Sequence, residues 1–171
     1  MLQLSGTMLN RNVLSLRTGS PIAVISGSII NPDNLKIEGF YCEDVTDHKQ
    51  LVLLYQDIRD VLPQGVVVDD FDALADPTDL VRLEKVLALS FELIGKPVET
   101  ISRSKLGKVS DYAFESVTMY IQKVYVSQSI LKSLTGGNLS IDRNQVQEIT
   151  PKKVIINDLL QPTRVTAAAP A

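Results

Sequence analysis

An internal repeat is the feature that most constrains how this chain can fold. The segment RDVLPQGVVVDD at 59–70 returns 88 positions later as QEITPKKVIIND at 147–158. Each segment begins with mixed apolar and polar residues, which are followed by a proline, three β-branched residues and an aspartate. Such self-similarity decides the architecture before any other pattern is considered. The chain must therefore contain one structural unit made twice.

The two copies cover residues 8–70 and 93–158. Near their starts the offset is 85, with NVLSL at 12–16 matching PVETI at 97–101. We therefore expect three extra residues in a surface loop between about 127 and 139, because insertions are tolerated in surface loops. Residues 71–92 form a linker with a short helix, and residues 159–171 are expected to be a flexible tail.

Within each copy the apolar residues are spaced by two, as in YIQKVYVS at 120–127. Alternation of β-branched residues between turns rich in Gly, Pro, Ser and Asn is typical of strands. Several short strands at close spacing favour a small barrel, which also removes sticky sheet edges. The predicted fold is all-β, with two tandem small β-barrels joined by a short α-helix.

The linker has a different pattern, which predicts a helix from about 78 to 88. Asp76 is placed to cap it, and Pro77 suits the first helical position. Leu80, Leu83 and Leu87 then recur on one face of the helix. We expect this apolar stripe to dock on the barrels and to fix them relative to each other, or else to bind a partner.

The second copy resembles the PRC-barrel family, which is named for a photosynthetic reaction centre subunit. The likeness lies in LIGKPVETISRSKLGKVSDY at 93–112, with Leu-Gly-x-Val-x-Asp at 106–111, and in IDRNQVQEITPKKVIIND at 141–158. In the first copy Pro21 and Ile22 are aligned with Leu106 and Gly107, so that copy is assigned through its likeness to the second.

The resemblance implies a non-enzymatic protein-interaction or adaptor module, because members of the family hold partners in place. The alternative is a ribosome-associated maturation or RNA-processing factor related to RimM, which carries one such barrel beside a different N-terminal barrel. Nucleic acid is then expected only through ribosome association. A protein partner is expected in either case, and a homodimer is possible.

Charge and composition restrict the other classes of protein to which the chain could belong. The net charge is −3, which argues against a general nucleic-acid binder. Residues 1–88 hold 7 Lys and Arg against 13 Asp and Glu, whereas residues 89–171 hold 10 against 7. A single cysteine excludes an internal disulfide, and neither a signal peptide nor an apolar stretch of membrane-spanning length is evident. We expect a cytoplasmic protein without a membrane span.

Two further segments are candidate interaction sites. A basic rim on the second copy comprises Lys96, Arg103, Lys105 and Lys108, and is either a solvated face or a contact for phosphates. The inserted segment SILKSLTGGN carries Ile130, Leu131 and Leu134, which share one face if they form a helical turn. This segment either folds back as a lid, which we favour, or meets a partner.

The sequence predicts no catalytic site, cofactor or metal. His48 lies in a polar loop without a nucleophile motif nearby. Cys42 follows two aromatic residues and is interpreted as a small buried hydrophobe. The aspartates at 69–76 lack the glycine and glutamate of a calcium-binding loop, so they are interpreted as a solvated linker that ends in a helix cap.

Overall fold

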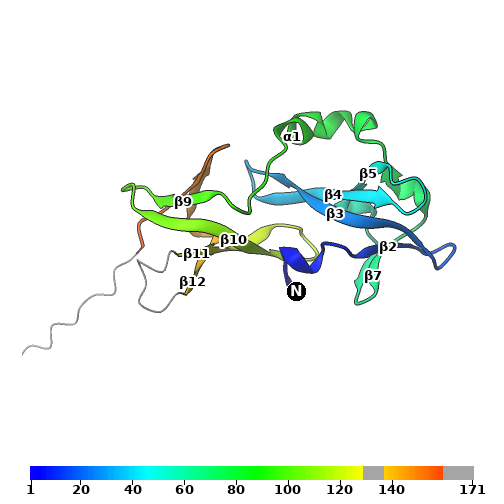
Figure 1. Cartoon of the computed structure of the whole chain (residues 1–171), viewed down its shortest axis with the longest axis horizontal. Helices are drawn as coiled ribbons and strands as arrows, with labels where there is room; N and C mark the ends of the chain where they lie inside the picture. The colour runs from blue at the N-terminus through cyan, green and yellow to red at the C-terminus, as the bar shows by residue number, and fades with distance from the viewer. Residues whose placement is uncertain (129–136, 160–171) are drawn as a thin grey trace, which may run out of the picture.

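A computed structural model describes residues 1–128 and 137–159 of the chain. Within them the chain is mostly β, with two mixed sheets and one short α-helix (Figure 1). The all-β class predicted from the alternating pattern is therefore confirmed.

The first copy forms one seven-stranded sheet in the order β6-β7-β2-β3-β4-β5-β8. Only β2 and β7 pair in parallel, and the other neighbours are antiparallel. The strands are β2 (Asn12–Ser15), β3 (Pro21–Asn31), β4 (Lys36–Asp44), β5 (Gln50–Leu54), β6 (Asp60–Leu62), β7 (Gly65–Val68) and β8 (Leu74–Ala75).

The second copy forms the other sheet in the order β12-β11-β10-β9-β14-β13, with β1 added to β10. Its one parallel pair is β9 with β14. The strands are β1 (Leu2–Leu4), β9 (Pro97–Thr100), β10 (Lys105–Glu115), β11 (Ile121–Ser127), β12 (Asn138–Asp142), β13 (Val146–Ile149) and β14 (Val154–Ile156).

Six strands of each sheet have the same order, so the sequence repeat is also a structural repeat; β8 of the first sheet and β1 of the second have no counterparts. The parallel pairs correspond residue by residue, since Val13 pairs with Val66 and Val98 pairs with Val154. Irregularities in the ladders also recur: β3 and β10 each have an extra residue, Ser26 and Ser110, opposite β4 and β11. β-bulges reorient a strand locally, and their recurrence shows that both copies follow one backbone path.

The structure corrects the alignment of the copies by one residue in the β3–β4 hairpin. Ile25 is the counterpart of Val109, and Gly27 the counterpart of Asp111, which gives an offset of 84 instead of 85. The turn from β2 to β3 is one residue longer than the turn from β9 to β10. This extra residue changes the offset between the copies from 85 to 84. The loop before β12 is accordingly four residues longer than its counterpart, not three.

Neither sheet closes into a barrel by backbone pairing within the described residues. The end strands β12 and β13 do not pair with each other, although only a 3-10 turn, η6 (Arg143–Gln145), joins them. The first copy has the equivalent turn η2 (Tyr55–Asp57) between β5 and β6. In the second sheet the turn η6 joins the two end strands, whereas in the first sheet β8 pairs with β5 and forms the edge. The strand spacing predicted closed barrels, and this closure is not observed in the described residues.

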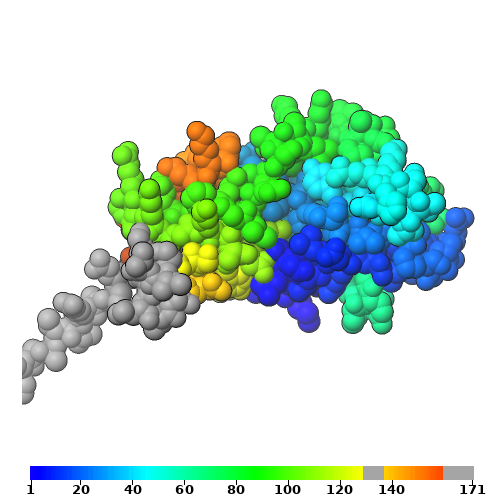
Figure 2. Space-filling view, in the orientation of Figure 1, coloured from blue at the N-terminus to red at the C-terminus, as the bar shows by residue number. Residues whose placement is uncertain are grey.

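The buried side chains of both copies form one continuous hydrophobic core. It includes counterparts such as Ile25 and Val109, and Val66 and Val154, all of which are at most 2% exposed. Each large apolar side chain buried in this way stabilises the fold by about 1.5–3 kcal/mol. The two copies therefore support each other, as Figure 2 shows in the contact between blue and yellow segments.

The tips of two equivalent hairpins meet at the junction between the copies. Lys36 and Tyr120, which are counterparts, form an isolated antiparallel bridge. The Ile37 N–H donates to the Met119 carbonyl, and the Ile121 N–H donates to the Leu35 carbonyl, both at 2.9 Å.

Such reciprocity is the mark of a two-fold contact, in which each side offers the same groups to the other. The copies are therefore related by a pseudo-two-fold axis that passes through this bridge.

Leu35 and Met119 adopt left-handed backbone conformations, with φ of 53° and 61°. Such conformations cost a residue other than glycine on the order of 1–3 kcal/mol. Both side chains are buried and both carbonyls accept a hydrogen bond from the other copy. The contacts across the junction offset the strain.

The N-terminal strand also joins the copies. β1 precedes the first copy in sequence but pairs with β10 of the second, with Leu2 opposite Glu115 and Leu4 opposite Ala113. Next to it, the Ser5 hydroxyl in η1 (Ser5–Thr7) donates to the Asp111 carboxylate. The first residues of the chain are thus held by the second sheet.

The linker is less helical than predicted. It contains the 3-10 turns η3 (Phe71–Ala73), η4 (Pro77–Asp79) and η5 (Val81–Leu83), followed by α1 (Glu84–Leu89). The predicted cap is confirmed, since the Asp76 side chain accepts from the Thr78 N–H at 3.0 Å.

The apolar stripe Leu80, Leu83 and Leu87 is half-buried, and α1 lies against β3. The strands and hairpin tips described above join the copies directly, so the stripe is not the sole connection between them.

Gly107 provides a test of the close approach of β10 to β11. Its φ is +144°, and a Cβ there would lie 2.0 Å from the Ser127 carbonyl oxygen. We expect Gly107→Ala to lower the free energy of unfolding by at least about 2 kcal/mol, through combined strain and clash. Urea unfolding followed by circular dichroism measures this.

The matched control is Ala23→Gly, because Ala23 is the buried counterpart of Gly107. It should cost only about 1 kcal/mol, the usual effect of glycine in a strand. Equal losses for the two variants would show that the approach at Gly107 is not tight.

Candidate interaction groove

A groove with a volume of about 500 Å³ opens on the second copy beside β9 and β10. Its floor and walls combine apolar side chains with charged ones. The lining residues are Pro97, Val98, Glu99, Lys105, Leu106, Gly107, Lys108, Ser127 and Gln128.

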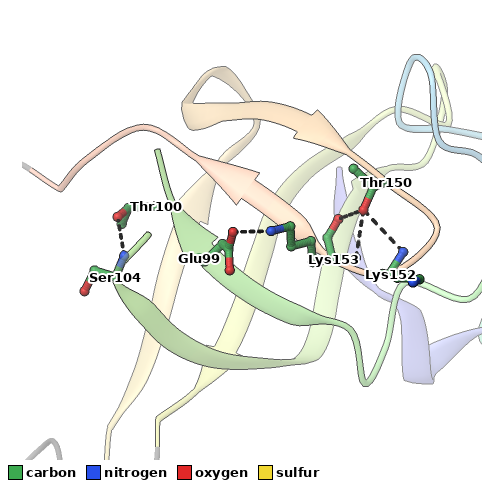
Figure 3. A network of polar contacts seen from close by, with 6 residues as sticks. All are labelled: Glu99, Thr100, Ser104, Thr150, Lys152 and Lys153. Atoms are coloured by element: carbon green, nitrogen blue, oxygen red, sulfur yellow. Dashed lines mark hydrogen bonds and ion pairs between the residues drawn. The ribbon is translucent and has the colours of Figure 1, made fainter. Parts of the chain in front are cut away.

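The charges of the groove are organised around Glu99 on β9. Its carboxylate accepts a hydrogen bond from the Lys153 ammonium in an ion pair at the start of β14 (Figure 3). The Glu99 side chain is only 18% exposed. Lys105 lies directly opposite Glu99 in the register of β9 and β10, and exposed Lys108 follows on the same strand. The groove is therefore lined by one carboxylate and two lysines, and Lys153 pairs with that carboxylate.

The turn before β14 holds Lys153 in position. The Thr150 hydroxyl accepts from the backbone N–H groups of Lys152 and Lys153 at 3.3 and 3.0 Å, as Figure 3 shows. The Thr150 N–H donates to the Lys153 carbonyl at 2.9 Å. Lys96 adds a bond from Nζ to the Pro151 carbonyl at 2.7 Å. The lysine that pairs with Glu99 is thus fixed by a network.

The turn that follows β9 is fixed in the same way. The Thr100 hydroxyl accepts from the Ser104 N–H at 3.1 Å (Figure 3). Asp158 accepts from the hydroxyl and the N–H of Ser102 at 2.6 and 3.1 Å, and these bonds lower the pKa of that carboxyl. Both ends of β9 are therefore anchored, so the position of Glu99 is preorganised.

The first copy lacks the charges of Glu99, Lys105 and Lys153 at the equivalent positions, although Glu43 and Asp44 are the counterparts of the lining residues Ser127 and Gln128. The counterparts of Glu99 and Lys105 are Leu14 and Pro21, which pair with each other in the same register. The counterpart of Lys153 is Gly65, where a Cβ would lie 2.4 Å from the Asn12 carbonyl oxygen. One backbone framework therefore carries lysines in the second copy at positions that are uncharged in the first.

The basic rim predicted from sequence is only partly brought together. Lys105 and Lys108 line the groove. Lys96 lies 4.8 Å from the ring centroid of Phe91 and supports the turn at Pro151. Arg103 is exposed in the β9–β10 turn, with φ of 66°.

Sequence reasoning missed Glu99 and Lys153 because they lie on strands 54 positions apart. Comparison of the copies could have found them, since their counterparts are uncharged.

The other predicted interaction residues lie elsewhere. Leu80 and Leu83 line a second cavity of about 450 Å³, together with Val81, which is 76% exposed. Leu87 is half-buried on α1. Ile130, Leu131 and Leu134 lie outside the described residues.

The remaining reactive side chains have structural roles. Cys42 is fully buried, as predicted, and burial raises the pKa of its thiol to about 12. His48 is exposed and pairs through Nδ1 with Glu43 at 2.6 Å. Asp69, Asp70 and Asp76 form ion pairs with Arg59, Arg17 and Lys49, respectively. Lys49, with help from Thr78, lowers the pKa of Asp76.

Within residues 1–128 and 137–159, no cluster of three or more His, Cys, Asp or Glu side chains is arranged to hold a metal ion. The same residues contain no helix with the length and apolar character needed to cross a bilayer. The sequence matches no known family model and no curated protein.

Burial of Cys42 gives a direct test of the first core. A thiol with a pKa of about 12 is protonated at pH 8, and its sulfur is inaccessible to reagents. We expect a disulfide reagent such as Ellman's to leave the native protein unreacted at pH 8 and to titrate one thiol per chain in denaturant. Rapid labelling of the native protein would contradict the buried position.

Proposed function

We propose that this protein is a non-enzymatic interaction module of the PRC-barrel type, an adaptor that binds a protein partner through the groove on its second copy. One observation carries the proposal: Lys105 and Lys108 line the groove in the second copy, whereas their counterparts on the same framework, Pro21 and Val24, are uncharged. A fold that needed these charges for stability would have them in both copies.

The chemistry of the groove favours an acidic partner segment with apolar side chains. Lys105 and Lys108 line it, and Pro97 and Leu106 supply apolar surface. The Glu99–Lys153 pair is an example of a lysine beside this groove that binds a carboxylate. Charge complementarity of this kind determines partner choice and association rate. The basic balance of residues 89–171 supports the same assignment.

An adaptor function also agrees with the chemistry of the reactive side chains. The Cys42 thiol is buried and protonated at neutral pH, and His48 is an exposed partner of Glu43. Nucleophilic catalysis needs an activated nucleophile beside a base, and these two side chains do not provide one. We propose a cytoplasmic location for this binding function.

Site-specific photo-crosslinking tests the proposal. A photoreactive amino acid replaces Lys108 in one protein and its counterpart Val24 in a second. In lysate, we expect position 108 to label one predominant protein and position 24 to label none. The double variant Lys105→Glu/Lys108→Glu should lower binding of the identified partner by about tenfold or more, because charge reversal repels an acidic segment.

Lys85→Glu is the matched control, since Lys85 is exposed on α1, away from the groove. It should leave partner binding unchanged. Undiminished binding by the charge-reversed groove would overturn the proposal, as would labelling at 108 that disappears on nuclease treatment. The latter result would favour the ribosome-associated alternative.

A further inference from the structure

The junction between the copies contains four side chains in which each copy contributes one cation and one aromatic ring. The first copy supplies Lys36 at the hairpin tip and Tyr55 at the start of η2. The second copy supplies Tyr120 at the equivalent tip and Arg143 at the start of η6. The cation and the ring thus exchange positions between the copies.

These four residues are in contact. Lys36 Nζ lies 4.0 Å from the ring centroid of Tyr55 and 5.5 Å from that of Tyr120. It also donates to the Tyr55 hydroxyl at 2.8 Å, which raises the pKa of Lys36. Arg143 Cζ lies 4.5 Å from the Tyr120 centroid. Cations stack favourably on the faces of aromatic rings, most of all when they are partly desolvated.

Arg143 also crosses the junction. Its Nη2 donates to the Asn34 carbonyl at 2.6 Å, and its Nη1 lies 3.5 Å from the Leu35 carbonyl oxygen. Both carbonyls belong to the hairpin tip of the first copy. The guanidinium therefore holds the first copy and the Tyr120 ring at the same time.

Pairing of like copies would lose the contact of Lys36 with Tyr120, the cation–ring contact that crosses the junction. Two first copies would place one Lys36 against another at the bridge, and two second copies would place two Tyr120 rings there without a lysine between them. Like charges at such close range oppose association, which is how interfaces exclude wrong partners. The backbone bonds at the tips are reciprocal and do not distinguish the two cases.

We propose that the junction is a pairing surface whose partner is one copy of this repeat, and that Lys36, Tyr55, Tyr120 and Arg143 make it accept the unlike copy. The partner copy normally lies in the same chain. The unlike copy of a second chain offers the same groups, so two chains can exchange halves when only the exchanged pairing is complementary. This inference does not depend on the groove.

Two double variants of the full chain test it. Lys36→Tyr/Tyr55→Arg gives the first copy the side chains of the second, and Tyr120→Lys/Arg143→Tyr does the reverse. Each chain alone then contains two like copies. Mixed, unfolded and refolded together, they can form a dimer in which both junctions pair unlike copies.

We expect size-exclusion chromatography with light scattering to show dimers of twice the monomer mass in the mixture only. Each double variant alone should stay monomeric and melt roughly 3–8 °C below the natural protein. A mixture of the natural protein with Lys85→Tyr, which alters an exposed residue of α1, serves as the control and should stay monomeric.

The quadruple variant keeps the proposal testable if a double variant does not fold. It inverts the four residues within one chain, so it should be monomeric and recover most of the lost melting temperature. The proposal is overturned if the quadruple variant is no more stable than the double variants. It is also overturned if a double variant dimerises alone as readily as the mixture does.

Discussion

The structure depends on two reciprocal backbone hydrogen bonds, between Ile37 and Met119 and between Ile121 and Leu35. They form because Leu35 and Met119 accept left-handed conformations that turn their carbonyls toward the opposite copy. With the hairpin tips fixed in this way, the two open sheets share one core and β1 can reach β10. Neither sheet closes on itself, so the junction supplies burial that a closed barrel would have supplied within each copy.

Much of the fold could be predicted from the sequence, because repeats and alternating residues are local signals. The duplicated unit, the strands, the cap at Asp76 and the buried Cys42 all follow from short stretches of chain. The alignment of the β3–β4 hairpin with the second copy was wrong by one residue. Val24 and Ile25 are both β-branched, so residue type alone does not show which of them matches Val109. A slip of one residue exchanges the two faces of a strand, and only the register shows it.

The groove and the junction could not be predicted in the same way, because they are assembled from distant strands. Glu99 gains its role from Lys153, and Arg143 gains its role from the carbonyls of Asn34 and Leu35. Both features are differences between two copies that share a backbone. Once duplication had provided the framework, one copy could acquire a groove lined by lysines, and the two tips could become complementary.

The position of β1 in the second sheet has a consequence for folding. Leu2–Leu4 must wait for Ala113–Glu115, so more than a hundred residues leave the ribosome before the first strand finds its place. Contacts of such long sequence separation raise contact order and slow folding. The first sheet can form during synthesis, but the backbone groups of β1 remain without their partner strand until the second sheet is made. Chaperone binding during synthesis would therefore be concentrated at the unpaired segment Leu2–Leu4.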